Sequence, residues 1–257
     1  MKRLIAAIIF IMFVGQTVIA TPTTIIVRAR ARDAKFIGTG MGGAYVVIIN
    51  KLTGEVLAKG LTNGNSGNTT LLLQSAIKRH QVLTDAETAK FEATIELSEP
   101  LFVEVEVTAP VTRKHASVKG SVQLWLIPGK NITGDGIIVE LPGFIIDILQ
   151  PTTHEVFSRD TLNNKVNHIN FKTSVTMLCG CTITKGGTWN SDSLEVAAII
   201  KKDGKEFTRI KMSLTDKANI FSGTLKTEAK GLYQLTVYAF DPVTGNTGVD
   251  QTNFVIQ

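Results

Sequence analysis

Three sulfur-bearing residues near the middle of the chain have types and spacing suited to metal chemistry. Met177, Cys179 and Cys181 alternate within Val175–Ile183, and the chain has no other cysteine. Alternate side chains of an extended strand point to the same side, so the three sulfurs are expected on one face. Thiolate and thioether ligands select Cu(I). The spacing therefore predicts a copper-type site of Met177, Cys179 and Cys181, completed by His168 or, more remotely, by His154.

Two other states of the cysteines remain open. In an oxidising compartment two cysteines usually form one disulfide, although a single residue separates this pair. On a regular strand their Cα atoms would lie near the upper limit for bridging. The thiols can instead be inert core residues, since free cysteine and methionine are commonly buried. Gly180 favours a third arrangement, in which residues 179–187 leave the sheet as a loop.

Thiol–disulfide exchange is also a possible chemistry of the pair. A disulfide across one residue would exchange easily. Dedicated thiol oxidoreductases, however, usually lower a thiol pKa at a helix N-terminus within a C-x-x-C motif. This segment has neither feature, so exchange ranks below metal binding.

The first twenty residues are typical of a signal peptide. Lys2 and Arg3 precede the apolar run Leu4–Val14, and Val18 and Ala20 supply small residues before a cleavage point. The run is about half of the ~20 residues that a spanning helix needs. We therefore predict that residues 1–20 are removed, and that the mature chain is periplasmic or extracellular with no membrane span.

Length and charge favour two domains and exclude a nucleic-acid partner. After removal of residues 1–20, roughly 240 residues remain, enough for two ordinary domains. The formal net charge of the chain is +5, and Lys2 and Arg3 belong to the signal segment. One local concentration remains, at Arg28, Arg30 and Arg32. We interpret it as a solvated strand face, with contact to an acidic envelope surface as the alternative.

Residues 21–142 are expected to form a first β-sandwich. Phe91–Leu97 and Leu101–Val107 alternate apolar and polar residues, as half-buried strands do. The alternation puts their glutamates on the outer face, which excludes paired catalytic carboxylates. Trp125 is expected in the core or between domains. Gly38–Gly43 matches G-x-G-x-x-G, but a strand-like segment follows it where a dinucleotide site needs a helix.

A family resemblance covers about thirty residues of this half. The segments Gly42–Val47, Thr53–Ala58 and Gly60–Asn65 resemble carboxypeptidase regulatory-like, transthyretin-like β-sandwich domains. In that family a strand pair leads into a similar polar loop. The residues from Thr70 to Glu87 depart from the family's short connection. The resemblance concerns fold and implies no activity.

Residues 143–257 are expected to form a second sandwich of about seven strands with regular turns. The candidate strands are Phe144–Leu149, Lys165–Thr173, Val175–Ile183, Leu194–Lys201, Phe207–Leu214, Ile220–Thr227, Leu232–Phe240 and Thr252–Ile256. One of these is expected to be fused to a neighbour or irregular.

The second half resembles bacterial immunoglobulin-like domains. Gly231–Ala239 fits the tyrosine-corner pattern with Tyr233 at the corner, and Asp241–Gly248 fits a hairpin common in those repeats. Leu235 stands where an antibody domain has its second cysteine. The usual disulfide between the two sheets is therefore not expected.

Taken together, these patterns predict an exported, non-enzymatic binding or structural protein of two consecutive β-sandwich domains. The first hypothesis adds a soft metal ion, copper, in the second domain. The alternative is a cell-envelope or extracellular assembly protein whose Cys179 and Cys181 form a disulfide, and thiol exchange is the third. A protein or envelope partner is expected. The chain contains no serine-hydrolase elbow, H-E-x-x-H motif or P-loop.

Overall fold

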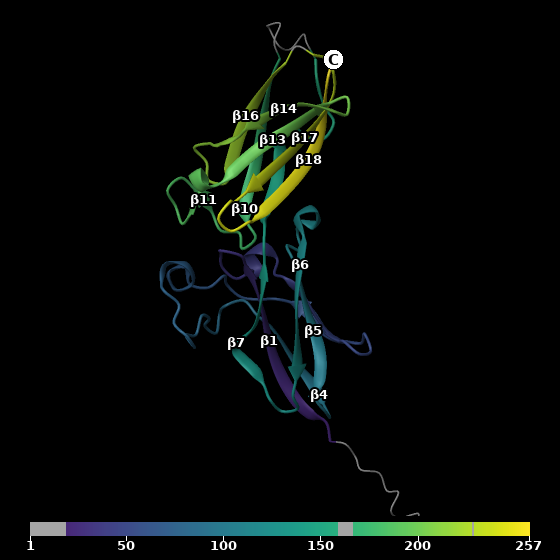
Figure 1. The fold of residues 1–257 in the computed structure, drawn as a ribbon, viewed down its shortest axis with the longest axis vertical. Helices are drawn as coiled ribbons and strands as arrows, with labels where there is room; N and C mark the ends of the chain where they lie inside the picture. Colours follow the sequence, from purple (N-terminus) through teal and green to yellow (C-terminus); the bar gives the residue numbers. More distant parts are fainter. Residues whose placement is uncertain (1–18, 159–166, 228) are drawn as a thin grey trace, which may run out of the picture.

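The computed structural model describes residues 19–158, 167–227 and 229–257. The expected signal peptide lies almost wholly outside these residues and stays a prediction. Nearly all of the regular structure is β, which confirms the all-β fold class. Two lobes lie end to end along the long axis and are joined between β7 and β8 (Figure 1). Within the described ranges, no helix has the length and apolarity to cross a membrane.

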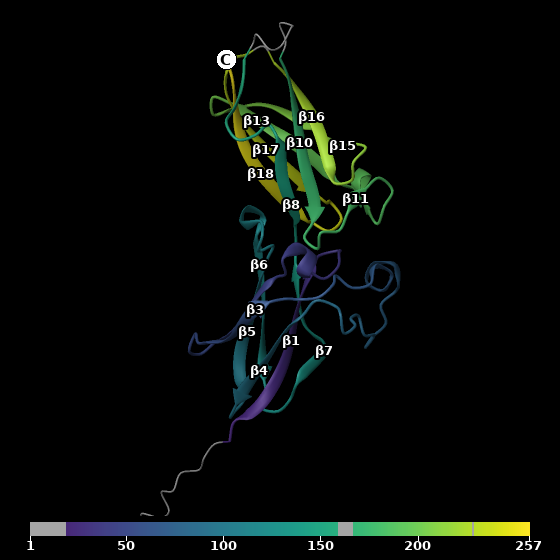
Figure 2. The ribbon, with the colours of Figure 1, turned by 180° about the vertical axis from the view of Figure 1, so that it is seen from behind.

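The first lobe is a sandwich of two sheets (Figure 2). One sheet has the order β4-β1-β7, and β1 pairs in parallel with β7. The other has the order β3-β2-β5-β6 and is antiparallel throughout. The strands are β1 (Thr21–Ala31), β2 (Tyr45–Asn50), β3 (Val56–Leu61), β4 (Phe91–Leu97), β5 (Leu101–Ala109), β6 (Val118–Leu126) and β7 (Ile132–Leu141).

Alternation along the strands builds the core of this lobe. In β5, Val103, Val105 and Val107 are fully buried, while the residues between them reach solvent. Glu104 lies on the outer face, where Lys51 Nζ and Ser121 Oγ donate hydrogen bonds of 2.8 and 2.9 Å to its carboxylate. These bonds lower the pKa of Glu104. The expected outward glutamates are thus surface groups.

The interpretation of the arginine cluster as a solvated face was wrong for Arg28, which is 2 % exposed. Its guanidinium donates to the carbonyl oxygens of Thr88, Ala89, Gly134 and Asp135. Burial lowers the pKa of Arg28, and the carboxylates of Asp135 and Asp85 oppose that shift.

The two neighbouring arginines differ from Arg28. Arg30 donates to the carbonyls of Ala34 and Leu72, and Arg32 forms a surface ion pair with Glu140 at 2.8 Å. The side chains of Arg28 and Arg30 on β1 therefore anchor the connection between β3 and β4 by hydrogen bonds. That connection includes a π-helical turn, η2 (Thr70–Gln74). Alternation alone could not predict this, because the long connection covers one face of β1.

Trp125 was expected in the core or between domains, and it is instead 58 % exposed. Its ring lies on the outer face of β6 beside Phe102, with centroids 5.1 Å apart. The two residues are directly opposed in the β5–β6 ladder. Cross-strand packing with Phe102 takes the place of the expected burial.

The second lobe is a sandwich of the immunoglobulin type. Its sheets have the orders β15-β16-β10-β8 and β14-β13-β17-β18-β9. Across the first sheet the strands β8, β10, β16 and β15 correspond to A, B, E and D. In the second sheet β13, β17 and β18 correspond to C, F and G, β14 is an added C′ strand, and β9 adds a parallel strand beside β18. The strands are β8 (Phe144–Gln150), β9 (Glu155–Phe157), β10 (Asn167–Met177), β13 (Glu195–Lys202), β14 (Lys205–Lys211), β15 (Ser213–Leu214), β16 (Ile220–Thr227), β17 (Gly231–Phe240) and β18 (Thr247–Ile256).

The tyrosine corner predicted at Tyr233 is confirmed. Tyr233 is fully buried, and its hydroxyl donates to the carbonyl of Ala229 at 2.7 Å. Its ring stacks on Phe254 at a centroid distance of 5.0 Å. The corner thereby ties the start of β17 to the core, as in other sandwiches of this type.

The junction between the lobes is packed. Most buried apolar residues of both lobes belong to one contiguous cluster, and Phe36, Leu72 and Ala89 of the first lobe form a separate small one. On one side, a short 3-10 turn, η3 (Lys114–Ala116), of the first lobe lies against β8. Arg113 Nε is 3.2 Å and His115 Nε2 is 3.5 Å from the carboxylate of Asp147, and His115 also bonds the carbonyl of Ile146. The opposite side carries the cysteine segment.

Candidate functional site

The cysteine segment is a loop and not the predicted strand over 175–183. β10 ends at Met177, and the amide of Gly180 donates to the carbonyl of Met177 at 2.8 Å, closing a turn. Gly180 has φ +76°, a left-handed conformation that glycine adopts without steric penalty. The loop runs between β10 and β13, in the place of the B–C loop, as Gly180 had indicated.

Cys179 and Cys181 are joined by a disulfide, with the two Cα atoms 5.4 Å apart. The turn at Gly180 brings the Cα atoms within the usual bridging range, which a straight strand would have reached only at its limit. The described residues therefore hold no free cysteine. The two residues are 7 % and 8 % exposed, so they are mostly covered.

The structure does not bring the four predicted metal ligands together. Met177 is buried in the last residue pair of β10, opposite Phe144. His168 lies nine residues earlier on the same strand, opposite Lys226, and is exposed. Nine residues of strand span roughly 30 Å. Within the described ranges, no three histidine, cysteine or acidic side chains cluster as metal ligands.

The glycine-rich segment Gly38–Gly43 packs against the disulfide loop. It contains a 3-10 turn, η1 (Thr39–Met41), and no nucleotide-binding helix follows it. The sulfur of Met41 lies 2.5 Å from where a β-carbon on Gly180 would stand. Gly180 thus serves two purposes: its φ allows the turn, and its missing side chain admits Met41 from the other lobe.

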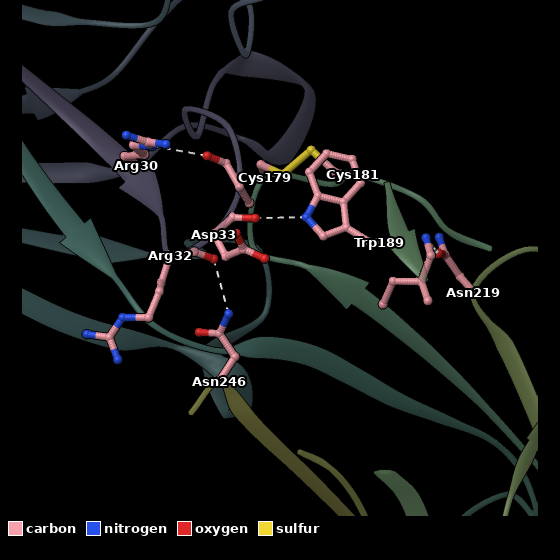
Figure 3. Close-up of a disulfide and its surroundings, with 10 residues drawn as sticks. Arg30, Arg32, Asp33, Cys179, Cys181, Trp189, Asn219 and Asn246 are labelled. Carbon is pink, nitrogen blue, oxygen red and sulfur yellow. Dashed lines mark hydrogen bonds between the residues drawn. A yellow bond between two sulfur atoms is a disulfide. The ribbon is translucent and has the colours of Figure 1, made fainter. Parts of the chain in front are cut away.

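Two side chains of the second lobe bond main-chain carbonyls of the first lobe (Figure 3). Trp189 Nε1 donates to the carbonyl of Asp33 at 2.9 Å, and its indole stands beside the disulfide. Asn246 is fully buried; its Nδ2 donates to the carbonyl of Arg32 at 3.1 Å, and its Oδ1 accepts from the amide of Gly143 at 2.8 Å. The loops equivalent to B–C and F–G therefore face the first lobe.

The far end of the loop is anchored within its own lobe. The parallel pair β11 (Ile183–Thr184) and β12 (Trp189–Asn190) fixes the position of Trp189. Asn219 binds Ile183 twice: its Oδ1 accepts from the amide at 2.6 Å, and its own amide donates to the carbonyl at 3.0 Å. Asn219 has φ +66°, a region that asparagine tolerates better than most residues.

Two carboxyl groups approach each other at the junction. Asp33 and Asp241 both line a small pocket of about 220 Å³, together with Trp189. Partial burial and the neighbouring charge of Asp241 raise the pKa of Asp33, and Arg30 opposes the shift. The carboxyl of Asp241 already accepts from Val243 and Thr244 in its own turn. The pocket is therefore part of the junction.

Sequence reasoning found the cysteines but missed most of their neighbours. Met41, Asp33 and Asn246 lie more than sixty residues from the disulfide, and no local pattern links them to it. The glycines on both sides were a usable signal, because close backbone approach is a common reason for glycine.

No known family model matches the chain, and no curated protein matches it. Among solved structures, the fibronectin(III)-like modules of Clostridium thermocellum CbhA match 92 % of this chain and 94 % of their own, at 8 % identity and TM-score 0.29. An ICAM-5 ectodomain fragment matches 93 % of this chain and 50 % of its own, at 8 % identity and TM-score 0.24.

An engineered protein matches 51 % of this chain and 24 % of its own, at 12 % identity and TM-score 0.30. The chain thus spans about a quarter of that protein's length. Superpositions at these scores do not identify a fold. The strand order of the second lobe is what identifies its immunoglobulin-like sandwich.

Proposed function

We propose that the chain is an exported, non-enzymatic structural or interaction protein of two tandem β-sandwiches, with Cys179 and Cys181 as a disulfide at their junction. We keep residues 21–142 and 143–257 as the domain limits, after a signal peptide of residues 1–20. The first domain is proposed to be of the carboxypeptidase regulatory-like type. The periplasm or the cell exterior is its proposed location, where disulfides persist.

The observation that carries this proposal is that the B–C and F–G loops of the second lobe contact the first lobe at the junction. In immunoglobulin-like variable domains, the B–C and F–G loops at one end of the sandwich form a binding surface. Here the corresponding loops bond Asp33 and Arg32 of the first lobe. This end of the second lobe is therefore covered, and we propose that a protein or envelope partner binds elsewhere on the end-to-end pair of lobes.

Copper binding is our second proposal, because the structure adds a soft ligand to the predicted set. The thioether of Met41 lies against Gly180, between the two cysteines. Copper would need the cysteines as thiolates, whereas the disulfide bonds the two sulfurs to each other. A Cu(I) site of Met41, Cys179 and Cys181 therefore requires a reduced loop, without His168.

Intact mass spectrometry of the exported protein under non-denaturing conditions separates the two proposals. The disulfide form has the mass of the mature chain less two hydrogens, with no bound ion. A bound copper ion that is lost in Cys179→Ser would contradict the disulfide and support the metal site. The same spectrum tests the cleavage after Ala20, because it gives the mass of the mature chain directly.

A further inference from the structure

A shallow hollow of about 420 Å³ opens directly over the disulfide. It is lined by both cysteines and by residues from three further segments. The lining comprises Lys35, Ser66, Gly180, Thr182, Thr184, Thr188 and Trp189. The sulfur-bearing residues thus form part of an open surface, although each is mostly covered. A reactant the size of a cysteine side chain can approach there.

Opening the disulfide would break no ladder hydrogen bond of the sandwich. β10 ends at Met177 and β11 begins at Ile183, so the two cysteines lie between strands. The turn is held independently by the bond from Gly180 to Met177 and by Met41 packed on Gly180. The two sulfurs would therefore stay close after reduction, and the ring could close again.

The electrostatics of the hollow favour a thiolate. In its lining, as far as the structure describes it, Lys35 is the single charged residue. A lysine near a sulfur favours the anionic form of an attacking or leaving thiol. Apart from the cysteines and Gly180, the rest of the lining is hydroxyl-bearing or aromatic, so no carboxylate of the lining opposes an incoming anion.

We propose that this hollow is a thiol-exchange site, at which a cysteine of a partner protein reacts with the Cys179–Cys181 disulfide. The proposal rests on the disulfide of the proposed function and adds a reaction to it. The partner's thiolate attacks one sulfur, the S–S bond breaks, and its electron pair leaves on the other cysteine as a thiolate. A mixed disulfide to the partner forms in the same step.

The mixed disulfide can react further in two ways. The free thiolate of the pair can attack it, which restores the disulfide and releases the partner's thiolate. Alternatively, a second thiolate of the partner attacks its own bridged sulfur; the partner is then oxidised to a disulfide, and Cys179 and Cys181 are left reduced. Two electrons pass from the partner to this chain.

The test uses glutathione as the probe and the full mature chain. Cys179→Ser and Cys181→Ser each leave one thiol, which oxidised glutathione converts to a mixed disulfide with release of one reduced glutathione. We expect the folded variants to gain one glutathione by mass. Variants that react only after denaturation in urea would overturn the proposal, because the sulfur would then be inaccessible in the fold.

A rate measurement on proteins that keep both cysteines guards against variants that misfold. We expect Lys35→Gln to slow reduction of the disulfide by reduced glutathione about threefold, the order of effect expected when one unit charge is removed from the lining of the hollow in a water-like medium. Lys59→Gln is the matched control, since Lys59 is an exposed lysine on β3 outside the hollow. Equal rates in the two variants would contradict the role of Lys35.

The outcomes also separate this inference from the proposed function. A folded chain that carries the disulfide but does not react with glutathione disproves exchange and leaves the structural role intact. A chain that leaves its compartment with copper and no disulfide disproves the proposed disulfide itself.

Discussion

The two sides of the junction hold the same two lobes by different means. On the disulfide side, Trp189 and Asn246 donate to main-chain carbonyls, and Asn246 is fully buried. On the η3 side, Arg113 and His115 face Asp147 through side chains that are one-third to one-half exposed. Buried hydrogen bonds are expensive to break, whereas exposed ion pairs contribute little. The disulfide side should therefore dominate the stability of the junction.

The largest effect is expected for Asn246→Ala. The substitution leaves the Gly143 amide and the Arg32 carbonyl without their partner, so we expect the free energy of unfolding to fall by about 2–3 kcal/mol. Urea titration measures the loss, and faster hydrogen exchange at Gly143 locates it. Asn170→Ala on the exposed face of β10 is the control and should change stability by less than about 0.5 kcal/mol. An equal loss in both variants would refute the assigned role of Asn246.

Removal of the disulfide should have an intermediate effect. The double variant Cys179→Ser, Cys181→Ser opens a very short ring, so chain entropy predicts a loss of about 1.5 kcal/mol in the free energy of unfolding. Treating the wild-type protein with a dithiol reductant should give a similar loss, and the double variant should not respond to it. A response of the double variant would show that the reductant acts elsewhere.

The η3 side should respond weakly and in a salt-dependent way. Asp147→Asn removes the partner of Arg113 and His115, and we expect a loss of at most about 1 kcal/mol at low ionic strength. In about 1 M salt the difference from wild type should vanish, because exposed charges are then screened. Glu92→Gln, which breaks the ion pair with Lys90 away from the junction, is the comparison for a surface pair. A salt-independent loss above that limit would reverse the ranking of the two sides.

The smallest effect is expected at Asp33, and it depends on pH. The fold raises the pKa of this carboxyl through partial burial and through Asp241, so its charged form is disfavoured in the folded state. Its contribution to stability is present below 3.8, the ordinary pKa of an aspartate in an unfolded chain, and is lost as the pH rises through the folded pKa.

Asp33→Asn removes that charge and suits the left-handed φ of +52°. At neutral pH the variant should be more stable than wild type by a few tenths of a kcal/mol, given solvent screening. The gain should disappear at about pH 3, where Asp33 itself is neutral. Thermal midpoints at the two pH values measure this, and a gain that persists at low pH would point to a cause other than charge.

The sequence predicted local geometry better than it predicted contacts between distant segments. Alternation identified β5 and the outward glutamates, and the corner motif identified Tyr233, whose hydroxyl the structure shows bonded to the carbonyl of Ala229. The strand pattern led to a wrong prediction for Arg28, and the aromatic residue type led to a wrong one for Trp125. A strand pattern shows which residues share a face, but not whether a long connection covers that face or leaves it open.

At the cysteine pair, the sequence by itself determined the reactive residue types, their separation by one glycine, and the sandwich that carries them. Gly180 indicated a loop there, but only the tertiary structure decided between the loop and the strand, joined the sulfurs to each other, and placed His168 far along β10. The physical reason is that a left-handed glycine allows the turn, whereas Met41 of the other lobe packs on it and the carbonyl of Asp33 binds Trp189 at the far end of the same loop. Those contacts come from chain segments far apart in sequence, which packing alone brings together.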